Sequence, residues 1–116
     1  MAEHGPLATT FSEHVAKLFQ GDAEGFGALF APDAVWVSTA GRIEGRAGVI
    51  GALAGLRDST GWQQHDVFQS AESDGYMTIM ARNHDADGRS FIVVGIAQFN
   101  DAGQISTIMS LGGLPR

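Results

Sequence analysis

Three of the four histidines and one arginine are the residues of this 116-residue chain best suited to acid–base chemistry. His14 lies within an apolar stripe at helical spacing, while His65 and His84 lie in two neighbouring β-rich segments. Imidazole titrates closest to neutral pH, so each ring is a candidate general acid or base. Arg82 carries a permanent positive charge that can neutralise a carboxylate or an enolate.

Each of these residues also has a purely structural explanation. His14 can be a core histidine bonded to the backbone, His65 and His84 can be exposed near a sheet end, and Arg82 can extend to solvent at a rim. Three histidines can also bind a metal, but the HxH or HxxxH spacing typical of such sites is missing. We therefore expect no metal and no cofactor.

The composition argues against several classes of protein. A formal net charge of −6, with seven lysines and arginines, argues against binding nucleic acid or anionic membranes. The chain has no cysteine, no sign of a signal peptide in residues 1–6, and only a short apolar run at residues 47–56. We expect one cytoplasmic domain over residues 1–116.

Apolar periodicity and turn residues predict helices first and strands afterwards. Helices are expected at residues 7–19, around Phe26 and at 46–57, with a strand at 34–39. Four more strands are expected at residues 62–72, 76–85, 89–100 and 104–111. Two of their connections contain Asp-Gly, which is typical of hairpins. The pattern predicts an α+β fold in which N-terminal helices pack on a curved, mostly antiparallel sheet.

Four short motifs resemble the NTF2-like superfamily in their order and spacing. They are residues 14–22 (HVAKLFQGD), 29–35 (LFAPDAV), 41–46 (GRIEGR) and 99–103 (FNDAG). The resemblance covers nearly the whole chain and implies a cone-shaped fold. It also implies kinship with SnoaL-like polyketide cyclases, ketosteroid isomerases, limonene epoxide hydrolases and scytalone dehydratases. Many such proteins dimerise through the sheet, so the resemblance implies a homodimer.

The resemblance places three residues where ketosteroid isomerases keep their catalytic groups. His14 takes the place of an oxyanion-donating tyrosine, Ser38 that of the carboxylate base, and Gly95 that of a protonated aspartate. Serine is a poor base and glycine has no side-chain donor, so the standard isomerase mechanism is not expected. Arg82-x-His84 only partly matches the Arg-x-Asp pair of epoxide hydrolases.

Counting outward from the two Asp-Gly turns predicts which side chains share a face of the sheet. Two-residue turns would pair Gln69 with Met80, Val67 with Arg82, His65 with His84, His84 with Phe91, Arg82 with Val93 and Met80 with Gly95. The resemblance puts Gly95 on the concave face. The predicted pocket lining is then His65, Val67, Gln69, Met80, Arg82, His84, Phe91 and Val93, with Trp36, Ser38 and His14.

The same counting leaves an apolar set on the opposite face, namely Met77, Ile79, Ala81, Ile92, Val94 and Ile96. Such a patch is typical of a partner surface. The alternative is that this face is the core and the sheet is inverted. A slip by one residue in either turn would turn a strand over, and Asp66 and Asn83 would become the acid–base and donor candidates.

The resemblance and the predicted pocket together imply an enzyme of secondary metabolism. We expect cofactor-free cyclisation, dehydration or isomerisation of a hydrophobic, oxygenated molecule such as a polyketide. His14 or His65 would move the proton, while Ser38, Gln69 and Arg82 position or polarise a carbonyl group. The expected ligand contacts are Trp36, Gln69, Met80, His84, Phe91 and Gly95. The alternative is a non-catalytic ligand-binding or assembly protein with the same fold.

Overall fold

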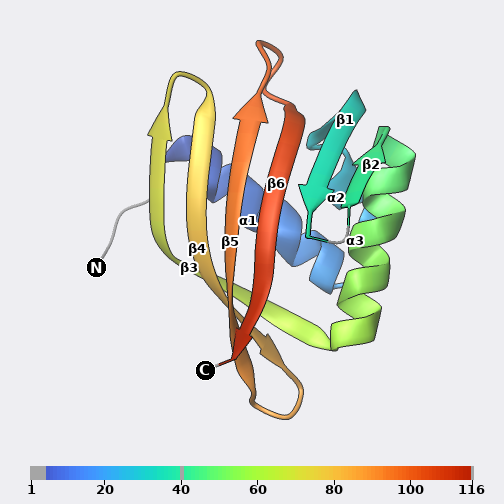
Figure 1. The fold of residues 1–116 in the computed structure, drawn as a ribbon, viewed down its shortest axis with the longest axis vertical. Coiled ribbons are helices and arrows are strands. Elements are labelled where there is room, and N and C mark those ends of the chain that lie inside the picture. Colours follow the sequence, from blue (N-terminus) through green and yellow to red (C-terminus); the bar gives the residue numbers. More distant parts are fainter. Residues whose placement is uncertain (1–4, 40, 116) are drawn as a thin grey trace.

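A computed structural model describes residues 5–39 and 41–115, in which helices pack on one curved sheet (Figure 1). The helices are α1 (Pro6–Phe19), α2 (Ala23–Gly27) and α3 (Arg46–Thr60). The strands are β1 (Phe30–Ser38), β2 (Gly41–Glu44), β3 (Trp62–Ser73), β4 (Tyr76–Asp85), β5 (Ser90–Phe99) and β6 (Ile105–Pro115). Their order in the sheet is β2-β1-β6-β5-β4-β3, and β1 and β6 form its parallel pair. The predicted α+β fold with a curved, mostly antiparallel sheet is confirmed.

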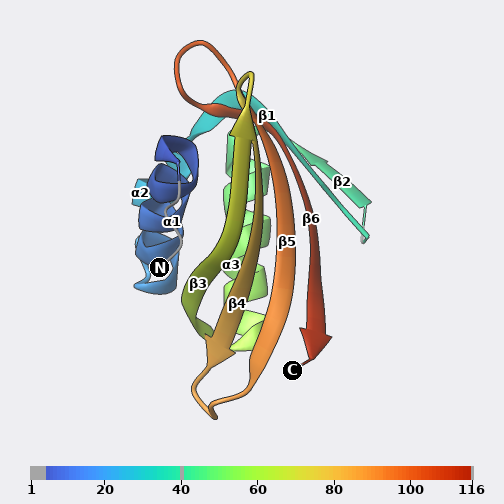
Figure 2. The ribbon, with the colours of Figure 1, turned by 90° about the vertical axis from the view of Figure 1, so that its left-hand side faces the viewer.

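Helix α1 lies across the concave side of the sheet, which Figure 2 shows in profile. The helix starts at Pro6, one residue before the predicted start, and Gly5 precedes it without a side-chain cap. The carboxylate of Glu72 on β3 replaces that cap, accepting hydrogen bonds from the backbone N–H groups of Leu7 (3.1 Å) and Ala8 (3.0 Å). This carboxylate satisfies two otherwise unpaired donors and ties the helix to the sheet.

Three residues at or near the ends of α2 and α3 have local roles. Asp22 caps α2 by accepting from the N–H of Gly25 at 2.9 Å. Gly27 allows α2 to approach α3, because a methyl group on Gly27 would collide with the side chain of Ile50. Gly61 ends α3 in the left-handed conformation (φ 71°), which glycine adopts without steric cost.

The β3–β4 hairpin follows the predicted register only near its turn. Asp74 (φ 53°) and Gly75 (φ 80°) form a two-residue turn that pairs Gln69 with Met80, as predicted. A β-bulge between Val67 and Gln69 then shifts the pairing by one residue. As a result Val67 lies opposite Ala81 rather than Arg82, and His65 lies opposite Asn83 rather than His84.

The β4–β5 connection is one residue longer than predicted. The N–H of Asp85 donates to the carbonyl of Arg89 (3.0 Å), which leaves residues 86–88 as a three-residue loop. The Asp85 carboxylate holds this loop by accepting from the N–H groups of Asp87 (3.0 Å) and Arg89 (2.9 Å). Gly88 supplies the positive φ of 81° that such a loop requires. The predicted two-residue turn is therefore wrong.

The longer loop turns β4 over relative to the prediction. Its inner side chains, which face the helices, are the fully buried Met77 and Ala81 and the nearly buried Ile79 and Asn83. Met80, Arg82 and His84 alternate with them and lie on the outer face. The inverted arrangement is thus correct for β4 and for β3 beyond its bulge, where Gln69 pairs with Met80, but not for β5, because Gly95 is buried on the inner face, as predicted.

We expect the Glu72→Gln variant to lose about 1 kcal/mol of unfolding free energy, since an uncharged amide interacts less favourably with the N-terminus of a helix. Denaturant unfolding monitored by circular dichroism measures this loss. Glu13→Gln is the matched control, because Glu13 is exposed within α1 and away from its N-terminus. Equal stability of the two variants would contradict the proposed capping role.

Candidate active site

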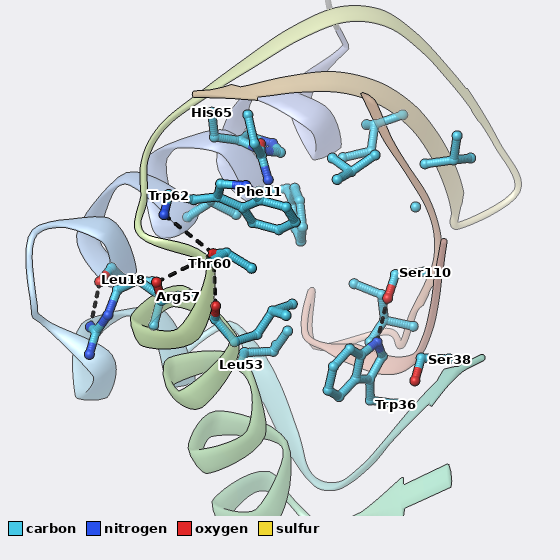
Figure 3. Close-up of a pocket in the computed structure, with 18 of the residues that line it drawn as sticks. Phe11, Leu18, Trp36, Ser38, Leu53, Arg57, Thr60, Trp62, His65 and Ser110 are labelled. Atoms are coloured by element: carbon cyan, nitrogen blue, oxygen red, sulfur yellow. Dashed lines mark hydrogen bonds between the residues drawn. The ribbon is translucent and has the colours of Figure 1, made fainter. Parts of the chain in front are cut away.

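The helices and the inner face of the sheet enclose a cavity of about 370 Å³ (Figure 3). Its walls are mostly apolar and include Phe11, Val15, Leu18, Phe19, Phe26, Leu53, Leu56, Ile79, Val93 and Ile108. The polar or indole-bearing residues of its lining are Trp36, Ser38, Thr39, Arg57, Thr60, Trp62, His65, Asn83 and Ser110. None of the described lining residues is an aspartate or a glutamate. A cavity of this size and character suits a small organic molecule.

His65 and Asn83 meet on the inner face because the β3 bulge pairs their strands at this point. His65 Nδ1 lies 2.7 Å from Asn83 Oδ1, and Asn83 is 4% exposed. An amide oxygen accepts but does not donate, so Nδ1 carries the proton in the neutral ring. This tautomer leaves a lone pair on Nε2, which is buried and has no partner in the described part of the chain.

The surroundings of His65 keep its ring neutral. The rings of Phe11 and Phe19 pack edge-to-face against it, with centroids 6.0 and 6.3 Å away. Burial among such groups lowers the pKa of His65 from its ordinary value of 6.5, although the Asn83 hydrogen bond and the Asp66 charge act in the opposite direction. His65 is therefore suited to accept a proton at neutral pH rather than to donate one.

The side of the cavity opposite His65 is formed by β1 and β6 (Figure 3). Trp36 Nε1 donates to Ser110 Oγ at 2.6 Å, which leaves the Ser110 hydroxyl proton available for a ligand. Near the end of α3, Arg57 Nη1 donates to the Leu18 carbonyl at 2.8 Å, and its Nη2 pairs with Asp58. The guanidinium of Arg57 thus connects α3 to α1.

Four of the predicted site residues line this cavity: Trp36, Ser38, His65 and Gly95. Phe91 shares the inner face and packs against Trp62, with ring centroids 6.0 Å apart, but it is not part of the lining. Gly95 lies close to Ile79, since a methyl group added there would be 3.3 Å from Ile79 Cγ1.

The other predicted site residues lie elsewhere. His14 is half-buried on α1, where its Nδ1 bonds the Thr10 carbonyl at 2.8 Å, and it is not part of the lining. Gln69 and Met80 lie on the outer face, opposite each other. Arg82 and His84 also lie there because β4 is turned over.

Arg82 and His84 each have a partner on the outer face. The Arg82 guanidinium lies 5.0 Å from the ring centroid of Phe68. His84 Nε2 lies 3.1 Å from Asp66 Oδ2. The predicted inward orientation of Arg82 and His84 is therefore wrong.

The sequence-based pocket lacked Asn83, Trp62 and Ser110. Asn83 enters the predicted pocket only if the pairing of β4 shifts by one residue. That shift is one of the alternatives predicted from the sequence. The alternating apolar residues Met77, Ile79 and Ala81 were the available signal, because such a pattern is typical of a buried sheet face. Nothing local in the sequence distinguishes Trp62 or Ser110.

Within the described residues, no helix has both the length and the apolar character needed to cross a membrane. No group of three or more His, Cys, Asp or Glu side chains in the same part of the chain is arranged to hold a metal ion.

The fold resembles several solved structures at low sequence identity. A proposed isomerase of the SnoaL-like family from Agrobacterium tumefaciens aligns with a TM-score of 0.78 at 13% identity, over 94% of this chain and 99% of that one. A proposed polyketide cyclase from Sinorhizobium meliloti gives 0.75 at 14% identity, over 93% and 95%. A proposed ketosteroid isomerase from Kribbella flavida gives 0.72 at 20% identity, over 92% and 75%. At these identities the likeness shows the NTF2-like fold alone.

No curated protein matches this chain in sequence. The family is shown instead by a match between the sequence and a family model. A family model described as a SnoaL-like domain matches residues 11–108, which contain both α1 from Phe11 onward and the strands that carry His65 and Asn83. The chain belongs to the SnoaL-like domain family.

Proposed function

We propose that this protein is an enzyme that uses His65 as a general base on a hydrophobic, oxygenated small molecule, without a cofactor. The observation that carries the proposal is a buried, neutral imidazole whose Nε2 lone pair has no partner among the described residues of an apolar cavity. Cyclisation, dehydration and isomerisation all need such a base. Two of the structural neighbours are described as a proposed isomerase and a proposed polyketide cyclase, and isomerisation and cyclisation are among these reactions.

Asn83 prepares His65 for this role. Its amide oxygen holds the proton on Nδ1, so the basic nitrogen is Nε2. Because Nε2 is buried, substrate reaches it when a neighbouring side chain such as Phe11 turns aside. Once the proton is on Nε2, the imidazolium returns it readily, since burial disfavours the charged ring.

The opposite wall supplies a hydroxyl group for a substrate carbonyl. Ser110 accepts from Trp36 Nε1 and so presents its own proton for donation. A hydrogen bond to the carbonyl oxygen stabilises the enolate that forms when a base removes the neighbouring carbon-bound proton. His14 and Arg82 have no part in this scheme, because neither lines the cavity.

The second candidate function is binding without turnover. It is favoured by the lack of a carboxylate among the described lining residues, since related chemistry often uses paired acids. A protein of this kind would hold the same class of ligand and release it unchanged.

Exchange of the α-protons of 2-tetralone in D₂O, followed by NMR, separates the two functions. We expect the protein to catalyse the exchange and His65→Gln to slow it by about 10²–10⁴-fold, because an amide cannot act as the base. His14→Gln is the matched control and should exchange at the normal rate, since His14 lies outside the cavity lining. Saturable binding of 2-tetralone without exchange would favour the binding protein.

The acid–base property of His65 is testable without any substrate. NMR titration should give a pKa for His65 below 6.5, because burial disfavours its charged form. Between that pKa and 6.5 the unfolded chain binds more protons than the folded protein, so stability is full above pH 6.5 and falls as the pH drops below it. His65→Gln should lose this part of the pH dependence. A His65 that titrates at or above 6.5 would remove the basis of the proposal.

We also propose that two copies of the chain associate through the outer face of the sheet. Ile96 (43% exposed), Met109 (49%) and Leu111 (59%) lie there beside Val37 and Val94, around a groove of about 230 Å³. None of the described residues lining this groove is charged, so the same residues on a second copy meet no electrostatic repulsion.

Replacement of Ile96 by lysine should shift a dimer to monomer in sedimentation experiments, because it places a charge in the apolar contact. Gln63→Lys is the control, since Gln63 is exposed near the start of β3 and away from the groove. A wild-type protein that sediments as a monomer at high concentration would contradict the association.

A further inference from the structure

Two buried side-chain nitrogens in the described part of the chain have no hydrogen-bond partner, and both belong to residues of the cavity lining. They are Nε1 of Trp62 and Nε2 of His65. An indole N–H can only donate. His65 Nε2 can only accept while Nδ1 carries the proton toward Asn83. The cavity wall therefore holds one unpaired donor and one unpaired acceptor.

The strand pairing puts these two side chains next to each other. Trp62 lies opposite Asp85, and His65 lies opposite Asn83. Asp85 and Asn83 are two residues apart on β4 and so share a face. The irregularity between Trp62 and Gln64 brings Trp62 onto that same face of β3. Figure 3 shows the Trp62 and His65 side chains together at one side of the cavity.

We propose that Trp62 and His65 together bind a neutral hydroxyl group on an apolar ligand, so that the hydroxyl donates to His65 Nε2 and accepts from Trp62 Nε1. The inference deepens the proposed function and rests on it, because it names the group that the substrate presents to the same base. A phenol, an enol or an alcohol satisfies both nitrogens at once.

A ketone, an ether, a carboxylate and an ammonium group each satisfy at most one of the two nitrogens. A ketone or an ether accepts from Trp62 but leaves the lone pair of His65 unpaired. A carboxylate brings negative charge against that lone pair, and an ammonium brings N–H groups against the indole N–H of Trp62. Since an unpaired buried polar group is costly, the pair selects for a hydroxyl group.

Access to the pair requires a local movement. Both nitrogens are buried, and the rings of Phe11 and Phe19 pack edge-on against His65. A ligand hydroxyl reaches Nε2 when one of these rings turns. The competing arrangement is a direct hydrogen bond between Trp62 Nε1 and His65 Nε2, which would leave nothing for a ligand.

Calorimetric titration with 2-naphthol, 2-methoxynaphthalene and 2-naphthoate at pH 7.5 tests the proposal. The three probes share one apolar framework and differ in the group offered to the pair. We expect 2-naphthol to bind at least about tenfold more tightly than either of the others, because only the hydroxyl both donates and accepts. This comparison uses the wild-type protein and needs no variant.

Two variants locate the preference at the pair. Trp62→Phe and His65→Leu should each reduce the preference for 2-naphthol over 2-methoxynaphthalene to about threefold or less. Trp36→Phe is the matched control, because the Trp36 indole lines the same cavity but already donates to Ser110 Oγ at 2.6 Å. It should weaken both probes alike and leave their ratio unchanged.

Equal affinity for 2-naphthol and 2-methoxynaphthalene in the wild-type protein would overturn the inference, as would an undiminished preference in Trp62→Phe. Tighter binding of 2-naphthoate would overturn it as well. These affinities are measured without turnover, so they are independent of the 2-tetralone exchange that tests His65 as a base. A hydroxyl preference with no exchange supports this inference and counts against the proposed catalysis.

Discussion

The three-residue loop held by the Asp85 carboxylate decides which face of β4 meets the helices. Side chains alternate along a strand, so one additional loop residue determines the direction of all ten side chains of β4. Together with the bulge after Val67, the loop brings Asn83 opposite His65 on the inner face. It also sends Arg82 and His84 to the outer face. The composition of the cavity follows from these two backbone irregularities.

The hydrogen bond between His65 and Asn83 determines the properties of the His65 ring. It orients the ring and determines the tautomer, while the surrounding phenylalanines lower the pKa of His65. A buried amide partner holds the ring without adding charge, unlike a carboxylate partner, which would favour the imidazolium. These features are the ones that the proposed neutral base requires.

The fold is shared with enzymes whose acids this chain lacks. Ser38 and Gly95, which the resemblance places at the isomerase carboxylate positions, do line the cavity. Trp62, His65 and Asn83, on β3 and β4, are polar or indole-bearing residues of the same lining. His14, which the resemblance placed at the tyrosine position, bonds its own helix backbone. The fold alone therefore does not determine what this cavity does.

The sequence alone determined the helices, five of the strands and their order, but it did not predict β2 (Gly41–Glu44). Apolar periodicity and the Asp-Gly turns are local signals, and they predicted these elements and the α+β class. Only the tertiary structure decided the register beyond the first turn. A bulge in β3 and a three-residue loop depend on contacts between strands, which local sequence does not encode. Side chains alternate between the two faces of a strand, so a shift of one residue reverses their direction. Asn83 was therefore predicted to face outward, whereas in the structure it faces inward and orients His65.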